Sequence, residues 1–333
     1  LSIPNIRSIV MKQQHSLYGI SFMLVNTLAL AGLDIAVKTL RQDLHAGIIV
    51  FLYKFSLLII ILPWVLKDGL KLLKTQRIMS HMLRSLFSVA GALCFYHGLY
   101  FVNMADAAAL ENLQYLIVTI FGIMFFSEEI SVSKIVAIIL AFIGALIVVN
   151  PEIISGFGTI QSTSYNKGHI LILLAISFWA CNTITVKLLS STEHNKTQMF
   201  YLLLTASILS IPPAFIKWSE VTLWNINLPL IPEFIDLSTI HLKLDHLLLI
   251  GFIAACYFIH GVMYFNALKS ELSVVIPFRY TKLMFSAFLG WLFFAEQHSK
   301  FSCIGYTLII IAGLLLVRSQ VQKISKKKKE MAA

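Results

Sequence analysis

The sequence predicts an all-α integral membrane protein with ten transmembrane helices in a five-plus-five inverted repeat. The 333 residues are 58% hydrophobic and only 13% charged, with a mean hydropathy of +0.82. This composition leaves too little polar surface to coat a soluble globule. Apolar runs of about 20 residues, long enough to cross the hydrocarbon core of a bilayer, recur along the chain. Short motifs also repeat between its two halves.

The apolar runs are separated by short polar segments. A backbone in lipid must satisfy its own hydrogen bonds, and these runs are too long and too uniformly apolar for barrel strands, so we expect α-helices. The predicted helices cover residues 17–39, 46–66, 79–101, 105–126, 132–150, 168–190, 197–216, 246–266, 271–294 and 301–318.

The first apolar run follows a predicted cytoplasmic tail, residues 1–16. Its Ala29–Ala31 segment imitates a signal-peptidase site. However, the hydrophobic stretch continues to Leu40, so we expect the run to be retained as a membrane helix. Met11 is a candidate start residue, and starting there would remove only part of the tail.

The distribution of basic residues predicts the orientation. With the amino terminus in the cytoplasm, 15 of the 26 Lys and Arg residues fall in cytoplasmic segments and 5 in outer segments. Such an excess is typical of the cytoplasmic side. Both termini are therefore expected there, and an even helix count requires that they share a side. Residues 319–333 form a basic tail whose Lys326–Lys329 run can touch anionic lipid.

Composition and motifs exclude several function classes. The net charge of +10 does not indicate nucleic-acid binding, because the basic residues lie between and beyond the apolar runs. The sequence has no catalytic motif in its required context, so we expect neither an enzyme nor a cofactor. The four cysteines are isolated within apolar segments, which predicts neither a metal site nor a disulfide framework. They are Cys94, Cys181, Cys256 and Cys303.

Three motifs occur in the same order in both halves. The pairs are Leu33–Leu40 with Asn182–Leu189, Phe95–Gly98 with Phe258–Gly261, and Phe125–Glu128 with Phe293–Glu296. We therefore predict a first five-helix repeat over residues 17–150, a linker over 151–167 and a second repeat over 168–318. Because five is odd, the second repeat enters the membrane from the opposite side. Inverted repeats place a binding site at their interface near the bilayer midplane.

Charged residues inside predicted helices mark candidate site positions, because each costs about 2.5–3.5 kcal/mol at a helix centre. Aligning the Phe-Phe-x-Glu motifs pairs Glu111 with Arg279 and Gln114 with Lys282. The alternative to a binding site is a permanent structural bridge between Glu111 and Arg279. The candidate binding residues are Glu111, Gln114, Tyr115, Trp179, Asn182, Arg279, Tyr280 and Lys282.

Three further charged residues are candidates for coupling or gating. Asp34 and Lys38 are four residues apart on the first helix, so one interpretation is that they neutralise each other. Lys187 is the repeat equivalent of Lys38 but has Thr183 four residues before it. This difference supports the alternative, a role in coupling or gating.

Two histidines recur at equivalent positions beside glycines. His97 and His260 could relay protons, and the alternative is close helix packing against the neighbouring glycine. Lys54 and Arg84 are assigned to helix ends, where their side chains could extend to the membrane interface.

Several stretches resemble a known family. The run from Pro277 to Glu296, with its counterpart ending at Glu128, resembles the EamA type of the drug/metabolite transporter superfamily. Within it, His81–Leu86, Tyr96–Leu99 and Pro277–Tyr280 are most similar to the S-adenosylmethionine uptake transporters of obligate intracellular bacteria.

This resemblance implies ten helices in a five-plus-five inverted repeat, a central cavity and a bacterial inner-membrane location. It implies secondary transport of a small organic metabolite by alternating access, with S-adenosylmethionine uptake as the specific expectation. Export of amino acids or amphipathic toxic compounds is one alternative, and a membrane scaffold or sensor is another. The expected partners are a small-molecule substrate and membrane lipid, with no nucleic acid, and a homodimer is left open.

Overall fold

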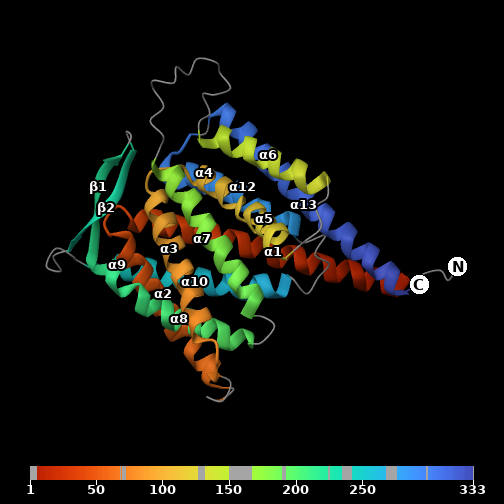
Figure 1. Ribbon diagram of the computed structural model, residues 1–333, viewed down its shortest axis with the longest axis horizontal. Helices are drawn as coiled ribbons and strands as arrows, with labels where there is room; N and C mark the ends of the chain where they lie inside the picture. The colour runs from red at the N-terminus through yellow and green to blue at the C-terminus, as the bar shows by residue number, and fades with distance from the viewer. Residues whose placement is uncertain are drawn as a thin grey trace.

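The computed structural model describes residues 6–67, 69, 73–126, 132–149, 167–189, 193–223, 226–234, 242–267, 276–297 and 299–332. They form a helical bundle (Figure 1). The first half contains α1 (Ile6–Leu40), α2 (Ala46–Leu66), α3 (Ile78–Leu99), α4 (Met104–Glu111), α5 (Gln114–Phe126) and α6 (Val132–Val149). The second contains α7 (Lys167–Leu189), α8 (Asn195–Leu209), α9 (Ile211–Phe215), α10 (Leu244–Ala267), the 3₁₀ helix η5 (Ile276–Tyr280), α12 (Thr281–Phe294) and α13 (Lys300–Ala332).

Seven helical stretches among the described residues are long and apolar enough to cross a membrane. They are Leu17–Leu40, Ala46–Leu66, Ile78–Leu99, Val132–Val149, Lys167–Val186, Lys196–Phe215 and Leu244–Tyr264. Each coincides with a predicted helix. The other three predicted helices are shorter or interrupted: 301–318 has its counterpart in the apolar stretch Lys300–Leu315, and 105–126 and 271–294 are each divided.

The predicted helices 105–126 and 271–294 change geometry at matching places, and the predicted helix 197–216 is also divided, at Ser210 between α8 and α9. Asn112 and Leu113 separate α4 from α5, so the prediction of one continuous helix over 105–126 is wrong. The Asn112 side chain donates to the Ala108 carbonyl at 3.0 Å, a local bond that competes with regular helix geometry. In the second half, η5 ends at Tyr280 and α12 begins at Thr281, and Pro277 in η5 lacks an amide donor. The aligned Phe-Phe-x-Glu motifs are 168 residues apart, so Tyr280 is the repeat equivalent of Asn112.

One two-stranded hairpin accompanies the helices, in a segment with no predicted helix. Strands β1 (Ile216–Leu223) and β2 (Ile226–Phe234) pair in antiparallel register, with an irregularity between Ser219 and Glu220. The hairpin lies at one edge of the bundle beside α9 (Figure 1). The all-α description therefore applies to the apolar helices and not to this connection.

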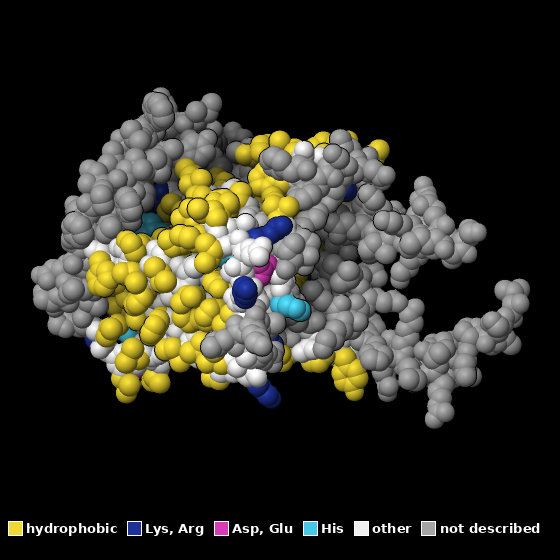
Figure 2. Space-filling view, turned by 60° about the horizontal axis from the view of Figure 1, so that its bottom comes forward, with side chains coloured by type: hydrophobic (Ala, Val, Ile, Leu, Met, Phe, Trp, Pro, Cys, Tyr) yellow, Lys and Arg dark blue, Asp and Glu magenta, His cyan; other side chains and the backbone are white. Residues whose placement is uncertain are grey.

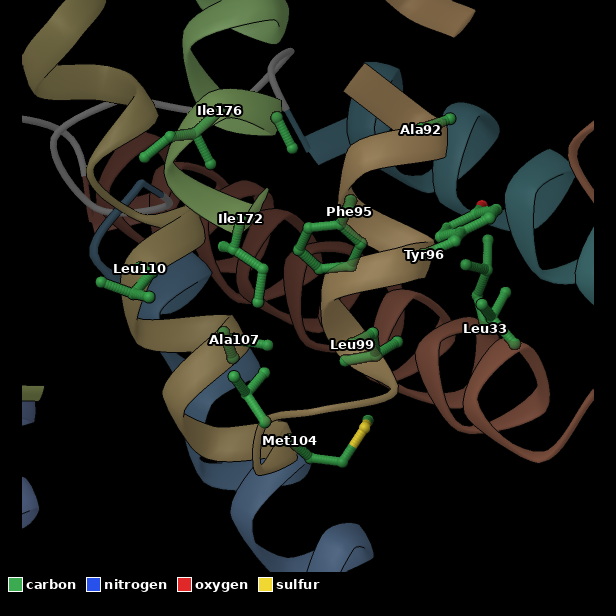
Figure 3. Close-up of a cluster of buried hydrophobic side chains, with 14 of the residues drawn as sticks. Leu33, Ala92, Phe95, Tyr96, Leu99, Met104, Ala107, Leu110, Ile172 and Ile176 are labelled. Carbon is green, nitrogen blue, oxygen red and sulfur yellow. The ribbon is translucent and has the colours of Figure 1, made fainter. Parts of the chain in front are cut away.

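The core of the bundle lies where helices of both halves meet. In Figure 3, Phe95 of α3 points toward Ile172 of α7, while the adjacent Tyr96 points toward Leu33 of α1. Tyr96 is nevertheless buried, with 4% exposure. Helix α3 thus packs one side chain into the apolar core and directs its neighbour toward α1.

The outer surface is apolar. Large hydrophobic side chains such as Phe142, Trp291 and Phe293 are more than half exposed, and apolar side chains cover most of the described surface in Figure 2, with a few charged and histidine side chains near its centre. A water-soluble protein rarely exposes so large an apolar surface. Lipid is the solvent that fits it.

Reciprocal glycine pairs bring two helix pairs into close contact. A Cβ atom added at Gly144 in α6 would lie 2.9 Å from the Gly305 carbonyl oxygen in α13, and one at Gly305 would lie 2.8 Å from the Gly144 oxygen. Gly98 of α3 and Gly168 of α7 are related in the same way, with 2.8 Å in both directions. Small residues allow such close backbone approach in membranes.

Replacing Gly144 with leucine is therefore expected to lower stability by about 1–3 kcal/mol, the usual cost of overpacking. Thermal unfolding of the detergent-solubilised protein measures the effect. The matched control is Gly251→Leu, because a Cβ atom at Gly251 meets no atom of the described residues within 4 Å. Equal melting temperatures for the two variants would contradict the packing argument.

Candidate functional site

A cavity of about 240 Å³ lies within the bundle, between helices of both halves. Its walls come from α1, α2, α3, α4, α5, α7, α10, η5 and α12. Five lining residues are charged: Asp34, Lys54, Glu111, Arg279 and Lys282. The breaks after α4 and η5 position this wall, since Glu111 and Arg279 lie directly beside them.

Lys282 is the central cation of the cavity. Its Nζ lies 2.8 Å from Asp34 Oδ2 and also donates to Glu111 Oε2. The three side chains are mostly buried, with 7% exposure for Lys282 and Asp34 and 17% for Glu111. This triad joins three helices. The positive charge of Lys282 on α12 is compensated by the carboxylates of Asp34 on α1 and Glu111 on α4.

The predicted alternative of a Glu111–Arg279 bridge is wrong, because the cation in contact with Glu111 is Lys282. The Arg279 guanidinium instead lies over the rings of Tyr115 and Tyr264, with Cζ 4.4 Å and 5.2 Å from their centroids. A 3₁₀ helix has about 3.0 residues per turn. Arg279 in η5 is therefore rotated away from the direction that a continuous α-helix would give it.

The predicted pairing of Asp34 with Lys38 is also wrong, because each residue contacts a partner on another helix. Lys38 Nζ lies 2.5 Å from Glu296 Oε1 and donates to the Val102 carbonyl at 2.6 Å. Glu296 Oε2 in turn accepts from the Met104 amide at 2.7 Å, an amide at the start of α4 that has no partner within its own helix. This Lys38–Glu296 bridge joins the ends of α1, α4 and α12.

The two repeat-related histidines have different surroundings. His260 lines the cavity, and Asn26 Nδ2 lies 2.8 Å from its Nδ1 and donates to its carbonyl oxygen at 2.9 Å. His97 is not a lining residue, and its Nδ1 lies 3.2 Å from Arg41 Nη2. The expected glycine packing holds beside His97, at Gly98, but a Cβ atom at Gly261 meets no atom within 4 Å in the described part of the chain.

The other predicted residues divide between the cavity and its surroundings. Gln114, Trp179 and Asn182 line the cavity. Gln114 Nε2 donates to Thr183 Oγ1 at 3.1 Å, and Asn182 Oδ1 is buried without a hydrogen-bond partner among the described residues. Tyr115 contacts the cavity through Arg279. Tyr280 is buried and packs against Gly313 of α13, away from the cavity.

The Lys187 backbone belongs to α7, but its side chain lies outside the described residues.

The prediction that the Lys54 side chain extends to the membrane interface is wrong. Lys54 lies eight residues beyond the start of α2, about 12 Å along the helix axis, and is 2% exposed. Its Nζ donates to Ser88 Oγ at 3.1 Å and lies 4.9 Å and 5.6 Å from the ring centroids of Tyr53 and Tyr257. Its depth in the helix, which the sequence gives, argues against extension to the interface.

Arg84 is not extended to the interface either. Its Nη1 donates to the Gln198 carbonyl at 3.1 Å and joins α3 to α8.

An apolar helical bundle whose buried cavity carries charges from both halves defines a multi-pass membrane protein with an internal polar site. The chain belongs to the EamA-like transporter family, whose model matches residues 17–150 and 166–318. The resemblance to this family is confirmed. The protein is thus a multi-pass bacterial membrane transporter.

Its relatives include transporters of different solutes. An S-adenosylmethionine uptake transporter of Rickettsia bellii is 25% identical over 310 residues, which cover 93% of this chain and 96% of that protein. The pseudopaline exporter CntI of Pseudomonas aeruginosa is 22% identical, covering 91% of this chain and 96% of that protein. A riboflavin transporter of Brucella anthropi is 25% identical over 84% of this chain and 90% of that protein.

A solved crystal structure, 14% identical, has the same fold. It superposes with a TM-score of 0.53 over 93% of this chain and 99% of its own.

Proposed function

We propose that this chain is a secondary transporter that carries a small organic metabolite through the charged cavity by alternating access. The observation that supports this function is a buried cavity whose charged walls come from helices of both halves. Charges in a membrane interior are costly and typically mark a substrate or ion pathway. A scaffold or sensor would not require such a cavity.

Ten membrane crossings in two inverted five-helix repeats, residues 17–150 and 168–318, are the architecture that fits this function. Every predicted span has a helical counterpart, and the breaks beside Asn112 and Tyr280 lie at repeat-related positions. Interrupted helices in corresponding positions of two halves are typical of binding sites in such transporters. The proposed location is the inner membrane, with both termini in the cytoplasm as the basic residues indicate. A homodimer is compatible with this proposal.

S-adenosylmethionine uptake is the first substrate assignment to test, because this is the activity named for the Rickettsia relative. The compound carries a carboxylate, which Arg279 could bind, and a purine, which Trp179 could stack on. Export is the second candidate, supported by the exporter among the relatives.

Flux through purified protein in liposomes tests this function directly. Labelled S-adenosylmethionine, riboflavin and a panel of amino acids are the solutes, and the imposed gradients include protons, sodium and preloaded solute. Protein-free liposomes and heat-inactivated protein are the controls. No flux of any solute through a folded preparation would count against transport and in favour of a scaffold.

Glu111→Gln is expected to reduce the rate for a transported solute about tenfold or more. The variant keeps the size of the side chain but removes one carboxylate from Lys282, and hydrogen bonds to charged groups contribute roughly 1.5–3 kcal/mol. The control is Glu193→Gln, whose carboxylate accepts from Thr75 at 2.6 Å and is not a cavity-lining residue. Unchanged affinity and rate in Glu111→Gln would remove this residue from the site.

A further inference from the structure

The charges in the cavity wall do not balance. Lys54, Arg279 and Lys282 contribute three cations, and Asp34 and Glu111 contribute two carboxylates. Lys282 contacts both carboxylates. With histidine neutral, the wall has a net charge of +1, and neither Lys54 nor Arg279 contacts a carboxylate in the described part of the chain.

Both of these cations also have hydrogen-bond donors left over. An ammonium group has three donors and a guanidinium group has five. Among the described residues Lys54 donates to Ser88 alone, and its Nζ also lies near the rings of Tyr53 and Tyr257. Arg279 lies over two tyrosine rings and donates to no described residue. Aromatic faces stabilise a cation but leave its N–H groups available for an anion.

Helix α10 gives the separation of the two cations. Lys54 Nζ lies 5.6 Å from the ring centroid of Tyr257, and Arg279 Cζ lies 5.2 Å from that of Tyr264. Both tyrosines are on α10, seven residues apart, which corresponds to about 10 Å along the helix axis. His260 lies between them and lines the cavity. The two cations therefore lie beside tyrosines that are about two helical turns apart on α10.

We propose that the cavity selects an elongated metabolite of net negative charge with an anionic group, such as a carboxylate, at each end. Lys54 binds one end, and Arg279 binds the other with the two-pronged geometry that suits a carboxylate. The inference rests on the proposed transport function and specifies its substrate class. It ranks such compounds above S-adenosylmethionine, which has one carboxylate and two cationic centres.

A series of dicarboxylates tests the spacing. Isothermal titration of the full-length protein in detergent uses unbranched α,ω-dicarboxylates from succinate to dodecanedioate, together with the monomethyl ester of each. Affinity is expected to rise to a maximum at an intermediate length that spans the two cations. At that length the diacid is expected to bind about tenfold more tightly than its half-ester. Equal affinity of diacid and half-ester at every length would overturn the proposal without any variant.

Lys54→Gln isolates one end of the proposed site. In this variant the preferred diacid and its half-ester are expected to bind equally, because only Arg279 remains to bind an anion. Lys54→Arg retains the charge and is expected to retain the preference for the diacid over its half-ester. This variant still tests the proposal if the glutamine variant fails to fold. Lys67→Gln, the same change at an exposed position just beyond α2, is the control.

A tenfold diacid preference that persists in Lys54→Gln would overturn the assignment of Lys54. The outcome is separable from that of the proposed function. Flux of neutral or cationic solutes without a preference for diacids would refute this inference alone, whereas absence of all flux and all binding would count against transport itself.

Discussion

Lys282→Met is expected to cost about 3–5 kcal/mol of stability and to abolish transport. The cost is that of removing one partner from a buried ion pair. Lys282 is the cation in contact with both Asp34 and Glu111, and its 2.8 Å contact with Asp34 connects α1 to α12. Methionine matches the length and apolar stem of lysine without its charge, so packing is largely conserved. Thermal unfolding in detergent and flux in liposomes measure the two effects.

A triple variant separates stability from function at this site. Combining Lys282→Met with Asp34→Asn and Glu111→Gln removes all three charges together, so no carboxylate is left buried without a cation. We expect most of the lost stability to return, since buried ion pairs can often be replaced by neutral groups at little cost, whereas transport stays lost. A triple variant as unstable as Lys282→Met would contradict the ion-pair explanation. Recovered transport would show that the triad has a structural role alone.

The helices were predictable because the thickness of the bilayer core sets the length of the apolar run that each spanning helix needs. All ten predicted spans have helical counterparts, and the seven full-length ones agree closely in their bounds. The interruption at Asn112 was not predictable from hydropathy, since a side-chain bond to the Ala108 carbonyl leaves the apolar pattern unchanged. Pro277, which has no amide donor, lies in η5 before Lys282. The β1–β2 hairpin was not predicted, although apolar and polar residues alternate along Ile216–Leu223 except at the irregularity between Ser219 and Glu220.

The site was predictable as a set of residues and not as a set of contacts. The cost of a membrane charge identified Asp34, Glu111 and Lys282, which form one cluster. Their partners depend on how neighbouring helices rotate, and a sequence repeat does not encode rotation. For this reason the sequence repeat pairs Glu111 with Arg279, whereas the cation in contact with Glu111 is Lys282. The prediction placed Lys54 near a helix end, whereas Lys54 lies eight residues beyond the start of α2 and is buried.

Glu296→Ala is expected to destabilise the protein by about 3–5 kcal/mol and to open one end of the cavity. Glu296 is 6% exposed and forms the bridge with Lys38, so its removal leaves a buried ammonium group without its carboxylate. The Met104 amide at the start of α4 also loses its acceptor. Glu296→Gln keeps an acceptor for this amide and removes only the charge. We therefore expect the glutamine variant to be the more stable of the two, and Lys38→Met to resemble it.

Cysteine labelling tests whether the Lys38–Glu296 bridge closes the cavity. Ser88 lines the cavity, so Ser88→Cys is introduced after the four native cysteines are replaced, and a membrane-impermeant maleimide is added from outside. The predicted orientation places the bridge on the outer side. Labelling is therefore expected to be about tenfold faster in Glu296→Gln, as a loss of roughly 1.4 kcal/mol from the closed state would give. If the ion pair holds the cavity closed, its loss must increase the rate of opening and therefore of labelling. An unchanged labelling rate with lowered stability would show that the bridge only stabilises the contact between helix ends.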